Sequence, residues 1–111
     1  MSRKSIAKFG IGQVIRHRVY AFRGVVFDVD PVFANRDLSY ETINLIEGRQ
    51  QKDQPFYYLF AENEQRPYIA YVSEQNLMLD RSGEPVSHPQ IEAMFERDES
   101  GRYRSRKLMM N

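Results

Sequence analysis

The sequence predicts a mainly β fold, a small and strongly bent barrel of about five strands with two short helices. The chain has 111 residues, which is the size of one domain. Hydrophobic residues make up 41% of it, enough for one modest core without disulfides. Short runs rich in β-branched and aromatic residues recur between turn-forming residues, a pattern typical of short strands.

The first two strands are expected in the N-terminal third. Residues 13–20 alternate β-branched and polar side chains, as a half-buried strand does. Residues 23–31 form a clearer strand, in which the two-residue period places Val25, Phe27 and Val29 on one face.

The second half predicts a hairpin followed by one more strand. Residues 55–61 are apolar on both faces, residues 62–67 carry the turn, and residues 68–72 return. A short fifth strand is expected at residues 77–79.

Two short helices complete the prediction. Inside the polar connector 32–53, Ser39 caps a helix over residues 40–47. A second helix begins at Pro89, because proline is favoured at the first helical position. Its apolar face is expected from residues at i, i+3 and i+4 spacing, namely Ile91, Met94 and Phe95.

One domain is expected, with a loose segment at each end. Residues 1–8 are polar and basic without a period and predict a flexible arm, residues 9–96 form the domain, and residues 97–111 predict a basic, mobile tail. The chain has no internal repeat and no low-complexity tract.

Composition excludes several classes of protein. The chain has no cysteine, so thiol catalysis, disulfides and iron–sulfur clusters are excluded. No apolar run is long enough to cross a membrane, and the first residues lack the apolar stretch of a secretory signal. A cytoplasmic protein is therefore expected.

The net charge of +1 conceals an uneven distribution. Residues 1–27 hold six basic and no acidic residues, residues 28–96 hold five basic and thirteen acidic, and residues 97–111 hold five basic and two acidic. This pattern indicates either separate basic and acidic faces with a function or an uneven solvated surface.

Arginines among aromatic residues are the strongest sign of a binding function. Arginine contacts phosphates with two donors and stacks on bases, and aromatic rings add stacking surface. Nucleic-acid binding is one interpretation, and a barrel with ordinary surface arginines is the other. The candidate DNA-binding residues are Arg16, Arg18, Arg23, Arg104, Arg106 and Lys107.

Four tyrosines of the expected hairpin suggest a protein-contact surface or self-association. Some of them must pack inside, but alternation cannot hide all of them, and exposed tyrosines bury much area at small entropic cost. The candidate protein-contact residues are Tyr57, Tyr58, Tyr68 and Tyr71.

A catalytic or metal site has little support. His17 lies between two arginines, and His88 precedes Pro89 at a helix start, so structural or surface roles are favoured for both. On a strand, Asp28 and Asp30 would face the same way. Such a pair either binds a cation, acts as an acid pair, or is simply the solvated end of the strand. We expect no enzyme, no metal and no cofactor.

Five ordered blocks of the sequence resemble the YccV-like, or hemimethylated DNA-binding, family. They are residues 8–18, 22–31, 52–57, 70–77 and 88–91. The resemblance runs from about residue 9 to residue 95, and it is weakest in the 32–51 connector and the tail.

The resemblance implies an SH3-like barrel. It also implies a heat shock protein with a role in the stress response, since the family includes such proteins. It also implies two partners: a Lon-type protease with its protein substrates, and hemimethylated DNA. Our first hypothesis is a non-enzymatic adaptor that promotes degradation of selected or denatured proteins, including the replication initiator, by that protease. The alternative is a DNA-binding module that prefers hemimethylated DNA. A homo-oligomer is a further expectation.

Overall fold

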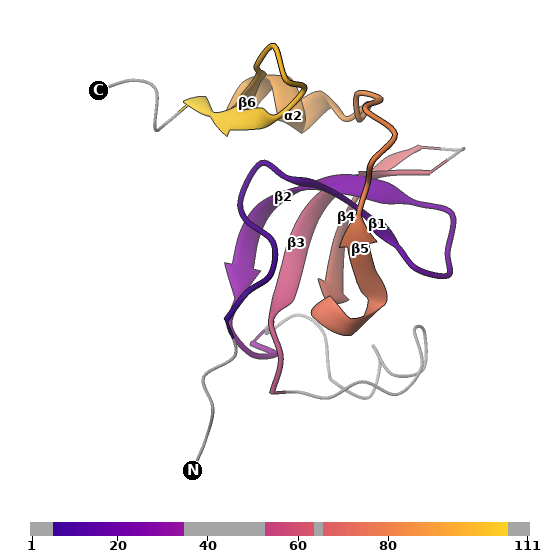
Figure 1. Ribbon diagram of the computed structural model, residues 1–111, viewed down its shortest axis with the longest axis vertical. Coiled ribbons are helices and arrows are strands. Elements are labelled where there is room, and N and C mark those ends of the chain that lie inside the picture. The colour runs from indigo at the N-terminus through magenta and orange to yellow at the C-terminus, as the bar shows by residue number, and fades with distance from the viewer. Residues whose placement is uncertain (1–5, 35–52, 64–65, 107–111) are drawn as a thin grey trace.

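The computed structural model describes residues 6–34, 53–63 and 66–106. The helix expected at 40–47 lies outside these residues, as do Lys107 and most of the expected N-terminal arm. Five strands form one antiparallel sheet in the order β4-β3-β2-β1-β5 (Figure 1). They are β1 (Val14–His17), β2 (Arg23–Asp30), β3 (Phe56–Glu62), β4 (Pro67–Ser73) and β5 (Leu77–Leu79).

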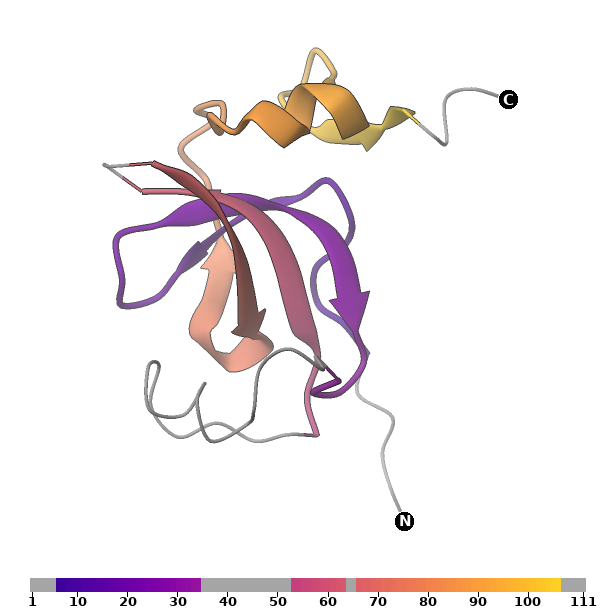
Figure 2. The same cartoon turned by 180° about the vertical axis from the view of Figure 1, so that it is seen from behind.

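The prediction of a mainly β fold is confirmed, but the five strands do not close into a barrel. A single 3-10 turn, η1 (Glu74–Asn76), joins β4 to β5, and β5 then pairs with β1. Within the described residues β4 and β5 are thus the two edges of a bent sheet, although they are neighbours in the chain (Figures 1 and 2).

A small unit lies across one end of the sheet. It consists of α2 (Pro89–Met94), β6 (Phe95–Arg97) and β7 (Tyr103–Ser105), and we call it the C-terminal unit (Figure 1). The structure differs here from the mobile tail expected from residue 97, because β6 and β7 pair as a hairpin and Tyr103 is buried. Tyr103 is the single apolar residue of β7, so no apolar period predicts this strand.

The main core fills the concave side of the sheet. It contains Ile15, Val26, Leu59 and Val72, all with almost no exposed surface. Burying each such side chain contributes roughly 1.5–3 kcal/mol before entropic costs.

A β-bulge in β2 divides that strand between two cores. The register with β3 shifts between Val26 and Asp28, so that Phe27 is the extra residue. Val26 and Val29 therefore face the main core, whereas Val25 and Phe27 face the opposite side. The prediction that Val29 shares a face with Val25 and Phe27 is wrong, because simple alternation stops at the bulge.

A second core joins the convex side of the sheet to the C-terminal unit. Val25 and Phe60 of the sheet pack there against Ile91, Phe95 and Tyr103. Met94, which was expected on the same face as Ile91, is instead exposed. Of the three residues expected on this face, Ile91 is buried from the helix, whereas Phe95 is buried from the extended chain after the helix end, where the helical spacing no longer applies.

A glycine permits the closest contact between the sheet and the C-terminal unit. Gly12 has a φ of +91°, and a Cβ at this position would lie 1.9 Å from the carbonyl oxygen of Tyr103. The Tyr103 N–H donates to the Gly12 carbonyl at 3.3 Å. Only glycine fits both the backbone conformation and this approach.

We predict that Gly12→Ala lowers the free energy of unfolding by more than about 1 kcal/mol, because both φ and space are incompatible with a side chain. Chemical denaturation measures this. Gly10→Ala is the matched control, since nothing lies within 4 Å of its Cβ position. Equal midpoints for the two variants would contradict the described contact.

Candidate nucleic-acid and protein interfaces

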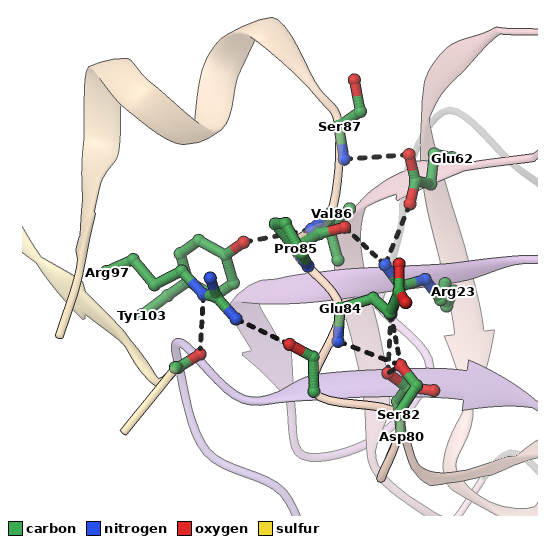
Figure 3. Close-up of polar contacts among 12 residues, drawn as sticks. Arg23, Glu62, Asp80, Ser82, Glu84, Pro85, Val86, Ser87, Arg97 and Tyr103 are labelled. Carbon is green, nitrogen blue, oxygen red and sulfur yellow. Dashed lines mark hydrogen bonds and ion pairs between the residues drawn. The ribbon is translucent and has the colours of Figure 1, made fainter. Parts of the chain in front are cut away.

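Arg23 is the centre of a polar network that holds the loop between β5 and α2. One guanidinium nitrogen lies 2.7 Å from an Asp80 carboxylate oxygen, and the other lies 3.2 Å from Glu62 (Figure 3). The same group donates to the Ser82 hydroxyl and to the Pro85 carbonyl. The Arg23 side chain is 20% exposed, so this candidate DNA-binding residue is engaged in contacts within the protein.

The carboxylates of this network also hold the loop backbone. The second oxygen of Glu62 accepts the Ser87 N–H at 2.9 Å, and the Ser82 hydroxyl donates to Asp80 while accepting the Glu84 N–H. We call these contacts of Arg23, Glu62, Asp80 and the loop the Arg23 network.

The far side of the same loop is bound by the C-terminal unit. The Val86 N–H donates to the Tyr103 hydroxyl at 3.0 Å, and the Arg97 guanidinium donates to the Gly83 carbonyl at 2.7 Å (Figure 3). The loop therefore connects the sheet to the C-terminal unit through polar contacts on both sides.

Two of the candidate DNA-binding arginines lie on or just after β1 with exposed side chains. Arg16 is opposite Arg23 on β2 and Met78 on β5, and the Arg18 backbone N–H donates to the Asn76 carbonyl. Both side chains face solvent, so they remain available to a phosphate backbone.

The other candidate arginines belong to the C-terminal hairpin. Arg104 lies 3.0 Å from Asp98, and Arg106 donates to the Glu92 carbonyl and lies 3.8 Å from Glu96. Hydrogen bonds from Ser100 and Arg104 hold the pKa of the Asp98 carboxyl well below its usual value. Arg104 and Arg106 are exposed, but their charges are partly offset by these carboxylates.

Two of the four candidate protein-contact tyrosines are buried. Tyr57 is fully buried, and its hydroxyl donates to Glu74 at 2.6 Å and accepts the Phe9 N–H at 3.2 Å. Tyr71 is 9% exposed, and its hydroxyl donates to Asp30 at 2.9 Å. Burial raises the pKa of both hydroxyls well above the usual value, as expected of structural groups.

Tyr58 and Tyr68 are partly exposed and on opposite faces of the hairpin. Tyr58 packs against the rings of Phe27 and Tyr71, while Tyr68 meets Phe22 edge to face. Each face of the hairpin holds one buried and one partly exposed tyrosine, so alternation alone does not determine which tyrosines reach solvent.

An apolar groove lies between β4 and the loop that joins β1 to β2, and we call it the edge groove. Its volume is about 600 Å³. One wall is the loop between β1 and β2, and the other is β4 itself. The lining residues are Tyr20, Ala21, Phe22, Asn63, Tyr68, Ile69, Ala70 and Tyr71.

Large apolar side chains beside this groove face solvent. Val19 is 79% exposed, Ile69 58% and Tyr20 48%. Sequence reasoning named Tyr68 and Tyr71 but missed the loop and Ile69. The available signal was Val19-Tyr20-Ala21-Phe22, an apolar run in the turn between two strands, where polar residues are usual.

His17 orders that loop. Its Nδ1 accepts the N–H groups of Val19 and Tyr20 at 3.0 and 3.1 Å, and its ring packs against Tyr20 and Phe22. The side chain is 5% exposed, so the structural interpretation of this histidine is the one supported.

His88 links α2 to the start of β4. Its Nδ1 accepts the Gln90 N–H at 3.1 Å and thereby caps α2, and its ring packs on Phe60. It also hydrogen-bonds the backbone of Tyr68. Burial lowers the pKa of this imidazole, and the hydrogen bond to Tyr68 opposes that shift.

Neither histidine belongs to a group of potential metal ligands. Among residues 6–34, 53–63 and 66–106, no cluster of three histidines or carboxylates is suited to a metal ion. Asp28 is exposed and accepts the Val29 N–H, whereas Asp30 accepts from Tyr71. No helix in the described part of the chain is long and apolar enough to span a membrane.

A family model described as hemimethylated DNA-binding protein YccV like matches residues 7–102. The chain belongs to the YccV-like family. The YccV-like match extends past residue 96 and so takes in β6 and the turn that follows it. The description of the family is that of a binding domain.

We predict that Arg23→Met lowers the free energy of unfolding by about 2–4 kcal/mol, because it leaves two partly buried carboxylates without their cation. Arg16→Met is the matched control on the neighbouring strand, because Arg16 is exposed. Its expected loss is within about 0.5 kcal/mol. Denaturant titration of both variants measures the difference, and similar losses would contradict a structural role for Arg23.

Proposed function

We propose that this YccV-like protein is a non-enzymatic adaptor of the stress response. It binds denatured or selected client proteins, the replication initiator among them, and promotes their degradation by a Lon-type protease. We place this activity in the cytoplasm. The observation that supports the proposal best is the exposed apolar surface at Val19, Tyr20 and Ile69 beside the edge groove.

Such a surface is costly for a protein that acts alone. Large apolar side chains that face solvent around an apolar groove are a common sign of an interaction site, since their exposure to water is unfavourable and promotes aggregation. Unfolded clients expose the apolar segments that such a surface can bury, whereas folded proteins hide them. Selectivity for denatured proteins follows from this difference.

The proposal predicts that the purified full-length protein speeds turnover of a heat-denatured client by a Lon-type protease several-fold, and leaves turnover of the same client in its folded form unchanged. Ile69→Ser reduces the stimulation because it removes exposed apolar surface from the groove lining. Ile6→Ser is the control, since Ile6 is 87% exposed but outside the groove lining. Unchanged turnover of every client, including the replication initiator, would contradict the adaptor function.

A second candidate function is recognition of hemimethylated DNA, which the family match favours. The residues that support it are Arg16 and Arg18, whose exposed side chains lie near each other on one strand and its following turn. Arg23 does not contribute, because its guanidinium belongs to the Arg23 network. Arg104 and Arg106 lie on the C-terminal hairpin and add positive charge there.

For this function we predict salt-dependent binding that is tightest for a hemimethylated duplex, compared with the same duplex unmethylated or methylated on both strands. The double variant Arg16→Gln and Arg18→Gln weakens binding about tenfold, because two phosphate contacts are lost. Fluorescence anisotropy at two salt concentrations measures this, with the exposed Arg81→Gln as control. Equal, weak binding of all three duplexes would contradict it.

A further inference from the structure

A second hollow shares the loop between β1 and β2 with the edge groove. Its volume is about 450 Å³, within the range of about 300–1,000 Å³ that is usual for small-molecule sites, and we call it the Arg16 hollow. Four residues line both hollows, namely Tyr20, Ala21, Phe22 and Asn63. The residues that line only the Arg16 hollow are Arg16, His17, Arg23, Glu62 and Asp80.

The charges that line the Arg16 hollow balance. Its more buried part belongs to the Arg23 network, in which the Arg23 guanidinium contacts the carboxylates of Glu62 and Asp80 (Figure 3). Together with Arg16, the lining holds two positive and two negative side chains. A phosphate deep in the hollow would lie against the two carboxylates and be repelled, whereas an uncharged ring with polar edges would not.

Aromatic rings form one wall of the hollow. The Tyr20 side chain is 48% exposed, and its ring centroid lies 4.7 Å from that of His17. The Phe22 ring also packs on His17, and the His17 Nδ1 accepts the Tyr20 N–H. The wall is therefore held in place before anything binds, and it offers a half-exposed ring on which a planar group can stack.

Exposed arginines lie beside this wall. Arg16 lines the hollow, and Arg18 follows it just before the loop. Neither side chain forms an ion pair with a described residue. Unpaired positive charge beside a neutral hollow with an aromatic wall is the complement of a nucleotide, whose base is uncharged and whose phosphate is negative.

We propose that the Arg16 hollow takes up one base that has left the stack of a DNA duplex. The base stacks on Tyr20, while Arg16 and Arg18 contact the phosphates that flank it. Methylation of one strand marks a single base of a pair, and a base outside the stack can be contacted on all its edges. This inference rests on the second candidate function, recognition of hemimethylated DNA, and specifies the subsite for one base.

The test uses the full-length protein and three duplexes of one sequence, followed by fluorescence anisotropy. One duplex is fully paired, one has a mismatched adenine, and one has an unpaired adenine. We expect binding to the two defective duplexes to be several-fold tighter, because a base that is not paired leaves the stack at lower cost. Equal affinity for all three would overturn the proposal, since contacts with phosphates do not depend on base pairing.

Variants of Tyr20 identify stacking as the cause. Tyr20→Leu is expected to weaken binding of the mismatched duplex about tenfold, because leucine is apolar but has no ring, whereas Tyr20→Phe retains the affinity. Val19→Ser is the matched control, since Val19 lies in the same loop and is 79% exposed but does not line the hollow. Thermal unfolding checks that each variant folds. Equal affinities of Tyr20→Leu and Tyr20→Phe, or an equal loss in Val19→Ser, would overturn the proposal.

The same titrations separate this inference from the second candidate function. If the protein prefers a hemimethylated duplex but neither pairing defects nor Tyr20→Leu change its affinity, DNA recognition stands and the base site is wrong. If it prefers the mismatched duplex through Tyr20 but ignores methylation, the base site stands and recognition of hemimethylated DNA fails. Deoxyadenosine monophosphate that displaces the duplex at equal concentration would show that the hollow binds a free nucleotide, and would overturn the proposal.

Discussion

The ion pairs of Arg23 with Glu62 and Asp80 connect three parts of the chain that are distant in sequence. Arg23 begins β2, Glu62 ends β3, and Asp80 follows β5. Through Ser82, Pro85 and Ser87 the same groups fix the loop that follows. That loop places Val86 and α2 against the convex face of the sheet, so the second core depends on an interaction that contains no apolar group.

The position of the C-terminal unit determines which surfaces remain for partners. It covers Val25 and Phe60 on the convex face, and His88 bonds to the start of β4. The loop between β1 and β2 and Ile69 of β4 are left uncovered, with Val19 and Ile69 exposed, whereas Tyr71, Val72 and Ser73 at the end of β4 are buried. Arg16 lies on β1 and Arg18 just after it, next to Val19, so a client segment and DNA would use neighbouring but different residues of one small domain.

The sequence predicted the strands well, because their β-branched and aromatic runs end at turn residues and their burial follows local alternation. It placed β3, β4 and β5 nearly as observed, and it placed Pro89 at the start of α2. The prediction was wrong where contacts between residues distant in sequence determine which side chains are buried. The bulge at Phe27 reverses the faces of β2, and Tyr103 is buried only because Gly12 permits the approach. Arg23 looked like its neighbours Arg16 and Arg18, since nothing local shows that Glu62 and Asp80 converge on it.

The C-terminal unit is an integral part of the fold, held by the second core and by the hydrogen bond between Val86 and Tyr103. Amide hydrogen exchange of the full chain, resolved by residue with NMR, tests this directly. We expect the amides of Val86 and Tyr103 to be protected nearly as strongly as those of β2 and β3. Rapid exchange at Val86 and Tyr103 while β2 and β3 stay protected would contradict it.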